Sequence, residues 1–301
     1  MSDALLLLPD LLLIVTGFVV CRYTPLGRPV WDAAEKLVYY LLFPVLLFQS
    51  IVRSPLNPAE TSTLAGSCIA ILLCGIGMAY VLRRVPGVDP ELHASGAQTA
   101  FRFNSFIALA LGERLGGTQG LAWTALLVAL CVPLCNVAAV WPLARHGGHS
   151  YLGELVRNPL ILSTLAGLLA NIAGLSLPDV ATATLQRIGS AALPLGLMSV
   201  GAGLKLGGLK ASPGLAAAFL SIRHALLPAL ALGVGQAVGL PPLQRLILVV
   251  FMALPTASSA YVLAARMGGN ASFVAGLVTL STALGMIGVP IWLFIARRAI
   301  G

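Results

Sequence analysis

A proline and three hydroxyl side chains interrupt an apolar stretch near the C-terminal end of the chain. The stretch, LVVFMALPTASSAYVLAARMGG, covers residues 248–269 and is long enough to span a membrane as a helix. Its middle holds Pro255, Thr256, Ser258 and Ser259. Proline cannot donate a backbone hydrogen bond, and an unpaired polar group in lipid is costly. A helix interrupted at this depth can offset that cost by presenting amides and a positive dipole end to an anion.

A second apolar stretch, QTAFRFNSFIALALGERLGG, carries a polar pair near its middle. Asn104 and Ser105 have side chains that compete with the helical hydrogen bonds. Two interrupted helices at matching positions of two halves are the best sequence indication of a transporter's binding site. Arg102 could attract an anionic substrate or extend to the cytoplasmic interface, and both interpretations are open. The alternative for Pro255 is a simple kink in a continuous helix.

Further polar residues fall inside apolar stretches. They could line a cavity or form hydrogen bonds between helices. These candidates are Gln49, Ser50 and Ser199. Arg223 and His224 also lie within a predicted span, and the sequence leaves their role open, because the arginine could extend to an interface and the histidine could carry a proton.

The acidic residues lie in loops or near the ends of the predicted spans. They are Asp3, Asp10, Asp32, Glu35, Glu60, Asp89, Glu91, Glu113, Glu154 and Asp179. A buried carboxylate pair for proton or cation exchange is therefore not expected, and an anionic cargo is favoured. The chain also lacks the DxxD, HExxH and GxSxG patterns of intramembrane enzymes. The sequence predicts no catalytic residue, no metal site and no cofactor.

Composition places the chain in the bilayer. Of its 301 residues, 58% are hydrophobic and only 9% are charged, whereas soluble domains are about 25% charged. The net charge of +8 comes from isolated or paired Lys and Arg without a basic stripe, so nucleic acid is not an expected partner.

Ten segments are predicted to span the membrane. They lie near residues 4–22, 34–52, 61–82, 97–115, 118–144, 158–176, 184–205, 213–238, 243–266 and 271–296. With the N-terminus outside, more of the lysines and arginines near span ends fall on the inner side than on the outer side. We therefore expect an all-α, multi-pass protein of the plasma membrane with both termini outside.

The two halves of the chain share a weak repeat. Pro9 and Gly17 recur as Pro159 and Gly167, and ERLGG at 113–117 recurs as ARMGG at 265–269. The repeat predicts an N-terminal five-helix half at 1–150 and a C-terminal five-helix half at 151–301. Because each half has an odd number of spans, the second enters the membrane from the opposite side, as in inverted-repeat transporters.

These stretches together resemble the auxin efflux carrier family over essentially the full length. The similar segments include YYLLFPVLLFQSIV, FRFNSFIALALGERLGGTQGLAW, RNPLILSTLAGLLANIAGLSLP, ALPLGLMSVGAGLKL and ALPTASSAYVLAARMGGN. The resemblance implies two inverted five-helix halves, similar to the bile-acid symporter plan, with helices 4 and 9 broken and crossing. It also implies that Asn104 and Pro255 match the family's span-four asparagine and span-nine proline, with substrate held near the crossing.

The chain departs from the family pattern in two places. Leu111 stands where many relatives have a proline, so the break in span four is expected nearer Asn104. The segment ARHGGHSYLGELVRN replaces the long cytoplasmic loop of plant members, so regulation through that loop is not expected.

The sequence therefore predicts a secondary-active or potential-driven carrier of a small organic anion, a carboxylate, and not an enzyme. Alternating access would move a carboxylate past the crossing of helices 4 and 9. The alternatives are a sodium-coupled symporter on the same fold and an intramembrane enzyme. The family resemblance also makes a homodimer through the scaffold helices plausible. Substrate identity, transport direction and the coupling ion are left open.

Overall fold

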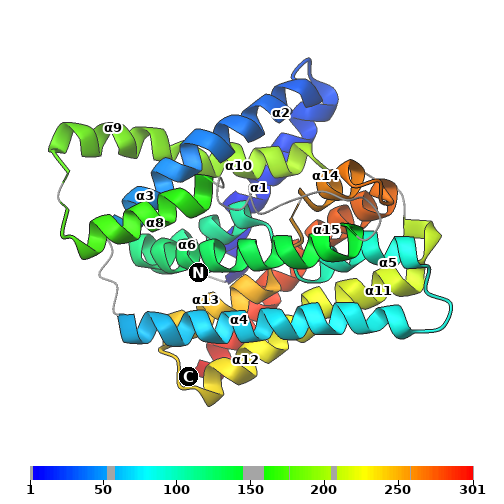
Figure 1. Cartoon of the computed structure of the whole chain (residues 1–301). Helices are drawn as coiled ribbons and strands as arrows, with labels where there is room; N and C mark the ends of the chain where they lie inside the picture. Colours follow the sequence, from blue (N-terminus) through cyan, green and yellow to red (C-terminus); the bar gives the residue numbers. More distant parts are fainter. Residues whose placement is uncertain are drawn as a thin grey trace. The chain divides into compact units, whose positions relative to one another are not determined.

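The computed structural model of the chain is helical, and the residues that it describes contain no strand. It describes residues 3–52, 58–144, 159–175, 177–204, 209–257 and 259–300. Figure 1 labels most of the helices along the chain. In the first half these are α1 (Asp3–Tyr23), α2 (Arg28–Leu37), η1 (Val38–Leu42), α3 (Phe43–Val52), α4 (Pro58–Val81), η2 (Leu82–Arg84), α5 (Pro90–Gly96), η3 (Ala97–Ala100) and α6 (Ser105–Ala144). In the second half they are α8 (Pro159–Ile172), α9 (Asp179–Ser190), α10 (Ala192–Ala202), η4 (Leu209–Ala211), α11 (Pro213–Ser221), η5 (Ile222–Leu226), α12 (Leu227–Ala237), α13 (Pro242–Ala253), α14 (Ser259–Arg266) and α15 (Ala271–Ile300).

Several of these helices are long and apolar enough to cross a bilayer. Within the described residues, four stretches meet both criteria: Thr61–Arg84, Pro90–Leu143, Pro213–Ala237 and Ala271–Ala299. Shorter apolar helices cover Leu12–Tyr23 and Pro242–Ala253. A chain with several such stretches is a multi-pass membrane protein, because no soluble core could bury so much apolar helix surface.

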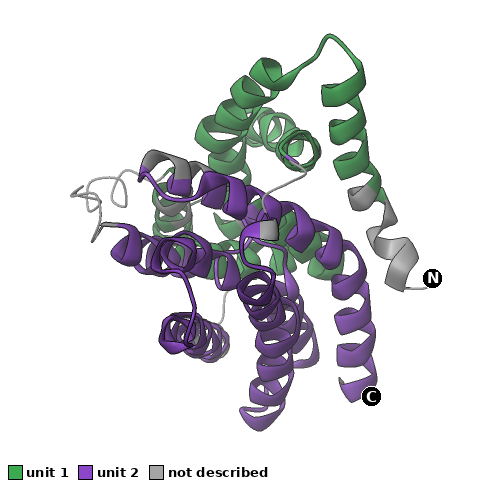
Figure 2. Ribbon diagram, turned by 90° about the vertical axis from the view of Figure 1, so that its right-hand side faces the viewer, with its two compact units in different colours: residues 1–58, 106–129, 152–203 green, residues 59–105, 130–151, 204–301 purple. Residues whose placement is uncertain are grey.

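The helices form two compact units, which are coloured separately in Figure 2. Unit 1 comprises residues 1–58, 106–129 and 152–203. Unit 2 comprises residues 59–105, 130–151 and 204–301. Each unit therefore takes helices from both the N-terminal and the C-terminal half of the sequence.

Glycines in unit 1 let α1 and α10 pack with their backbones in contact. A Cβ added at Gly17 would lie 1.9 Å from the carbonyl oxygen of Met198. A Cβ added at Gly201 would lie 1.7 Å from the carbonyl oxygen of Ile14. Small residues at such contacts are typical of membrane helices, where association depends on close van der Waals packing.

Side-chain amides in unit 1 donate to carbonyls of neighbouring helices. Gln49 donates to the carbonyl oxygen of Thr182 at 3.0 Å. Asn171 donates to the carbonyl oxygens of Ile51 and Val52, at 2.9 and 3.1 Å, where α3 ends. These bonds supply donors to carbonyls that would otherwise be poorly paired within an apolar unit.

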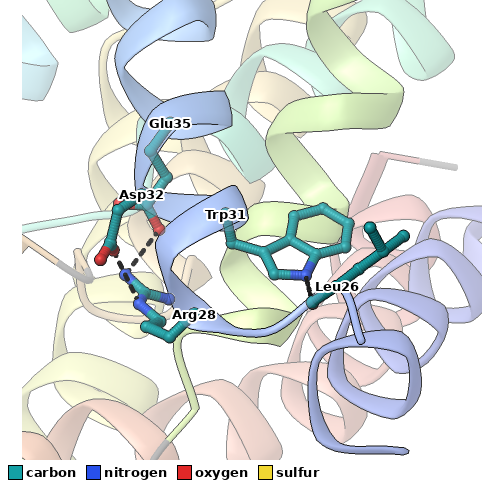
Figure 3. A network of polar contacts seen from close by, with 5 residues as sticks. All are labelled: Leu26, Arg28, Trp31, Asp32 and Glu35. Atoms are coloured by element: carbon teal, nitrogen blue, oxygen red, sulfur yellow. Dashed lines mark hydrogen bonds and ion pairs between the residues drawn. The ribbon is translucent and has the colours of Figure 1, made fainter. Parts of the chain in front are cut away.

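A polar network fixes the beginning of α2, also in unit 1 (Figure 3). Arg28 forms an ion pair with Asp32 at 2.8 Å and another with Glu35 at 3.1 Å. Trp31 is buried, and its indole N–H donates to the carbonyl oxygen of Leu26 at 2.9 Å. The two carboxylates therefore neutralise the arginine locally, and the indole ties the preceding turn to the helix.

Gly116 and Gly117 divide α6 into two arms. Their φ/ψ values of −135°/16° and 55°/−144° are not helical, and the positive φ of Gly117 suits only glycine. Gly112 and Thr124 lie on opposite sides of this kink and close together, since a Cβ added at Gly112 would lie 2.2 Å from the Thr124 hydroxyl oxygen. The kink coincides with the predicted boundary between spans at 115 and 118.

In unit 2, prolines leave helical carbonyls without their usual donor, and aromatic side chains replace it. Pro142 cannot donate to the carbonyl of Ala138, which accepts a hydrogen bond from the Tyr80 hydroxyl. The carbonyl of His224, four residues before Pro228, accepts the indole N–H of Trp292 at 2.8 Å. Helix-breaking residues are tolerated in membrane proteins where neighbouring helices supply such partners.

Candidate functional site

The first helix break lies between η3 and α6. Phe101 forms a turn, residues 102–104 have no regular structure, and α6 begins at Ser105. Asn104 thus occupies the N-cap position, where asparagine is among the preferred residues. Upstream, the Thr99 hydroxyl donates to the carbonyl of Gly96 at 2.7 Å, a local bond that competes with regular helix.

The second break lies between α13 and α14. The helix α13 ends at Ala253, residues 254–257 are not helical, and α14 begins at Ser259. Pro255 has no N–H to donate to the carbonyl of Phe251, so the helical ladder cannot continue through it. The Pro255 ring packs against Gly285 of α15, where an added Cβ would lie 3.1 Å from two of its ring atoms.

The two breaks are hydrogen-bonded to each other inside unit 2. The backbone N–H of Asn104 donates to the carbonyl of Pro255 at 2.9 Å. The Thr256 hydroxyl donates to the carbonyl of Thr99 at 2.7 Å. Thus the first break supplies a donor to an irregular carbonyl of the second, and the second supplies a donor to a carbonyl in η3, the short helix before the first.

Arg102 joins the first break to the beginning of α14. One terminal nitrogen donates to the side-chain oxygen of Gln98 at 2.9 Å, and the other donates to the Ser259 hydroxyl at 2.9 Å. The side-chain amide of Gln98 in turn donates to the carbonyl of Ala260 at 3.2 Å. The guanidinium is half-buried, whereas Ser259 is exposed. A positive charge is therefore held beside the N-terminus of α14.

Arg223 is completely buried and contacts both breaks. Its Nε donates to the carbonyl of Leu254 at 2.6 Å, and Nη2 donates to the carbonyl of Phe251 at 3.0 Å. Nη1 donates to the carbonyl of Phe101 at 3.4 Å. One of these carbonyls is the one that Pro255 leaves without its helical donor. Arg223 is thus placed against the C-terminal side of both interrupted helices.

A series of hydrogen bonds runs from the imidazole of His224, the residue after Arg223, through two hydroxyl groups. His224 Nε2 lies 2.8 Å from the Ser281 hydroxyl, which donates to the Thr256 hydroxyl at 3.0 Å. Ser281 also accepts the backbone N–H of Thr256 at 2.9 Å. If Thr256 donates to Thr99 and Ser281 donates to Thr256, the remaining proton between His224 and Ser281 belongs to Nε2. This series of hydrogen bonds ends on the carbonyl of Thr99, which fixes the orientation of the Thr256 side chain.

The residues singled out from the sequence lie in different environments. Asn104 is 4% exposed and Thr256 is 0% exposed, while Ser105 is half-buried at the beginning of α6. Ser258 lies outside the described residues. Asn104 and Thr256 lie within the two hydrogen-bonded breaks, and Ser105 begins the helix that follows the first of them.

The cavity candidates all belong to unit 1 apart from Arg102. Gln49 is buried and bonded to Thr182, as described above. Ser199 is fully buried on α10, and its hydroxyl has no hydrogen-bond partner in the part of the chain that the structure describes. Ser50 lies in α3.

Sequence reasoning did not assign the contacts of Arg223 and His224. The position of two cationic or titratable residues inside an apolar span was the available signal. The described residues contain no group of three or more His, Cys, Asp or Glu side chains able to hold a metal ion.

A helical, multi-pass protein with two interrupted helices bonded at their breaks has the features of a membrane transporter. Residues 143–293 match the family model described as "Membrane transport protein", and this is half of the chain. The chain therefore belongs to this family, the auxin efflux carrier family. It is also 23% identical over 297 residues to an "Uncharacterized transporter" of Methanothermobacter thermautotrophicus, with 94% of each chain covered.

Proposed function

We propose that this protein is a secondary-active or potential-driven carrier that moves a small organic anion, a carboxylate, across the plasma membrane by alternating access. The observation that carries the proposal is the pair of helix breaks joined by the Asn104–Pro255 hydrogen bond. New helices begin directly after these breaks, at Ser105 and Ser259. Their N-terminal amides and positive dipole ends favour an anion at this place.

The charges around the breaks support the same class of substrate. Arg102 lies in the first break and donates to the exposed Ser259 at the second. None of the acidic residues of the sequence falls within residues 92–112 or 180–301. A carboxylate that approached Arg102 and Ser259 would therefore meet donors and a cation without a competing side-chain carboxylate.

We assign different roles to the residues of this site. Asn104, Ser105, Ser258 and Ser259 would donate hydrogen bonds to the carboxylate, and Arg102 would supply positive charge. Pro255 ends the half-helix. Thr256 would hold the two breaks together, since its hydroxyl already donates to the carbonyl of Thr99.

The proposed architecture has ten spans in two inverted halves, 1–150 and 151–301, with helices 4 and 9 crossing at their breaks. Helices lie over each of the predicted spans. The division of the helices into two units supports different roles in transport for the two units. Unit 1 holds the first two predicted spans of each half together with residues 106–129 of α6, and unit 2 holds both breaks. Unit 1 would be the scaffold, through which a homodimer could form, and unit 2 the moving core. Both termini would lie outside.

A sodium-coupled symporter on the same fold is the second candidate. Unwound backbone carbonyls near the breaks favour it, since such carbonyls can coordinate sodium in transporters. Strict dependence of transport on sodium would distinguish it. An intramembrane enzyme would chemically change its substrate, which mass spectrometry would detect.

Counterflow in proteoliposomes tests the proposal. Purified protein would be reconstituted with an unlabelled organic acid inside and labelled acid outside, with sodium and pH varied independently. We expect accumulation of label by the wild type and its loss in the Asn104→Ala/Ser259→Ala double variant. Ser190→Ala is the matched control, because the Ser190 hydroxyl lies at the end of α9 and donates to the carbonyl of Arg187 in its own turn. Unchanged counterflow in a well-folded double variant would contradict the assignment of the site.

A further inference from the structure

The environment of Arg223 is unusual for a buried cation. Among the described residues, its hydrogen bonds all end on backbone carbonyls, those of Phe101, Phe251 and Leu254. No acidic residue lies within forty positions of it in the sequence, the nearest on its N-terminal side being Asp179. Burial of an unpaired charge is strongly unfavourable, so these carbonyls must supply the compensation.

The three carbonyls have a common electrostatic property. Phe251 and Leu254 lie at the C-terminal end of α13, where the helix dipole is negative and carbonyls lack helical donors. Phe101 follows η3 at the corresponding end of the other break. Half-helix C-termini and unwound carbonyls of this kind coordinate cations in sodium-coupled transporters. The negative ends of both breaks thus converge on one positive group.

We propose that Arg223 is a tethered cation that occupies a latent monovalent-cation site and holds the two breaks together. This proposal deepens the proposed carrier function and assigns Arg223 a positioning role, since its contacts are with the backbone that frames the anion site. It follows that the wild-type carrier needs no sodium at this position. Removal of the side chain should expose a site that accepts a free guanidinium ion or an alkali cation.

The shape of the side chain suits this role. A guanidinium presents five N–H donors in a rigid plane, so Nε, Nη1 and Nη2 can reach carbonyls of two different helices. A lysine ammonium carries the same charge as a compact point and cannot reproduce the fork. Arg223 lies in the π-helical turn η5, and its neighbour in that turn, His224, accepts a hydrogen bond from Trp292 of α15. The bond to Trp292 therefore fixes the backbone that carries Arg223 relative to the three carbonyls.

The test is chemical rescue of Arg223→Ala. The variant would be extracted and purified in choline, sodium, potassium or guanidinium chloride, the last at roughly 20 mM, far below denaturing concentrations. Thermal unfolding is read first because it does not depend on knowing the substrate. A tenfold excess of a rescuing ion over its dissociation constant should raise the midpoint by about 3–6 °C. Counterflow of labelled acids is then measured in the same salts.

Matched variants separate this role from general packing. Arg245→Ala removes another arginine that donates to a backbone carbonyl, that of Leu240, away from the breaks. Guanidinium should stabilise Arg223→Ala and leave Arg245→Ala and the wild type unchanged. Arg223→Lys should retain part of the stability but show a lower maximal rate, because it keeps the charge and loses the fork.

Each result decides the proposal. Rescue of Arg223→Ala by guanidinium, with wild-type counterflow equal in sodium and choline, supports it. Failure of every cation to stabilise Arg223→Ala overturns it, as does stimulation of the wild type by sodium. If the wild type transports no organic acid but guanidinium still rescues the unfolding midpoint, the proposed substrate fails and the tethered cation stands.

Discussion

Replacement of Thr256 by valine should weaken the junction between the two helix breaks without changing its shape. Valine has nearly the same volume as threonine, so packing is preserved while the hydroxyl is lost. The Thr256 hydroxyl donates to the carbonyl of Thr99 at 2.7 Å and accepts from Ser281 at 3.0 Å. The residue is 0% exposed, so water cannot replace either partner.

The expected loss follows from these two bonds. Each is worth about 1 kcal/mol, and leaving the Thr99 carbonyl unpaired adds about 1–2 kcal/mol, giving a total of about 3–4 kcal/mol. Thr282→Val is the matched control on α15, because Thr282 is also buried but donates only to the carbonyl of Val278 in its own helix. That control should lose only about 1 kcal/mol.

The assay is thermal unfolding of the purified variants, followed by tryptophan fluorescence, together with counterflow at a temperature where both are folded. The difference between the variants, about 2–3 kcal/mol, should lower the midpoint of Thr256→Val by about 4–12 °C relative to Thr282→Val. Counterflow should fall in Thr256→Val alone. Equal midpoints for the two variants would refute the idea that Thr256 joins the breaks.

Glycine substitutions test the packing around the breaks and within unit 1. Gly285→Ala should reduce counterflow because the added Cβ would press on the ring of Pro255. Gly288→Ala on the same helix should leave counterflow unchanged, because its Cβ would meet nothing within 4 Å. Equal activities of the two variants would contradict the packing of Pro255 against Gly285. Gly17→Ala should destabilise the protein by about 1–3 kcal/mol, since α10 leaves no space for the methyl group. Gly77→Ala, which has open space on α4, should leave the unfolding midpoint unchanged or slightly higher, and the reverse order would show that α1 and α10 are not in direct contact.

Much of the local structure was predictable from residue types. Apolar stretches indicated the helices, and Pro255 marked the break between α13 and α14 because it lacks a donor. The break before α6 was harder to place, since it contains no proline. Asn104 and Ser105 indicated its position, and the irregular residues lie immediately before Ser105.

The partners of the polar side chains were not predictable, because they come from distant parts of the chain. Arg223 donates to carbonyls 28, 31 and 122 residues away, and backbone carbonyls leave no signature in a sequence. Thr256 was predicted to donate to a solute, whereas its hydroxyl donates to Thr99, 157 residues away. The sequence left open whether Gln49 lines a cavity or forms a hydrogen bond between helices, and in the structure its side chain donates to the carbonyl of Thr182. An unpaired carbonyl nearby is a strong acceptor, and only the fold reveals where one lies.

Direct binding of charged and neutral analogues tests the central claim, that the two breaks hold a carboxylate. Equilibrium binding of labelled organic acids and their uncharged amides would be measured on purified wild type and on Arg102→Gln. We predict binding of an acid but not of its amide, and about tenfold or greater weakening in Arg102→Gln, the loss of one charge-assisted hydrogen bond. Equal affinity for acid and amide, or equal affinity of the two proteins for the acid, would contradict the account.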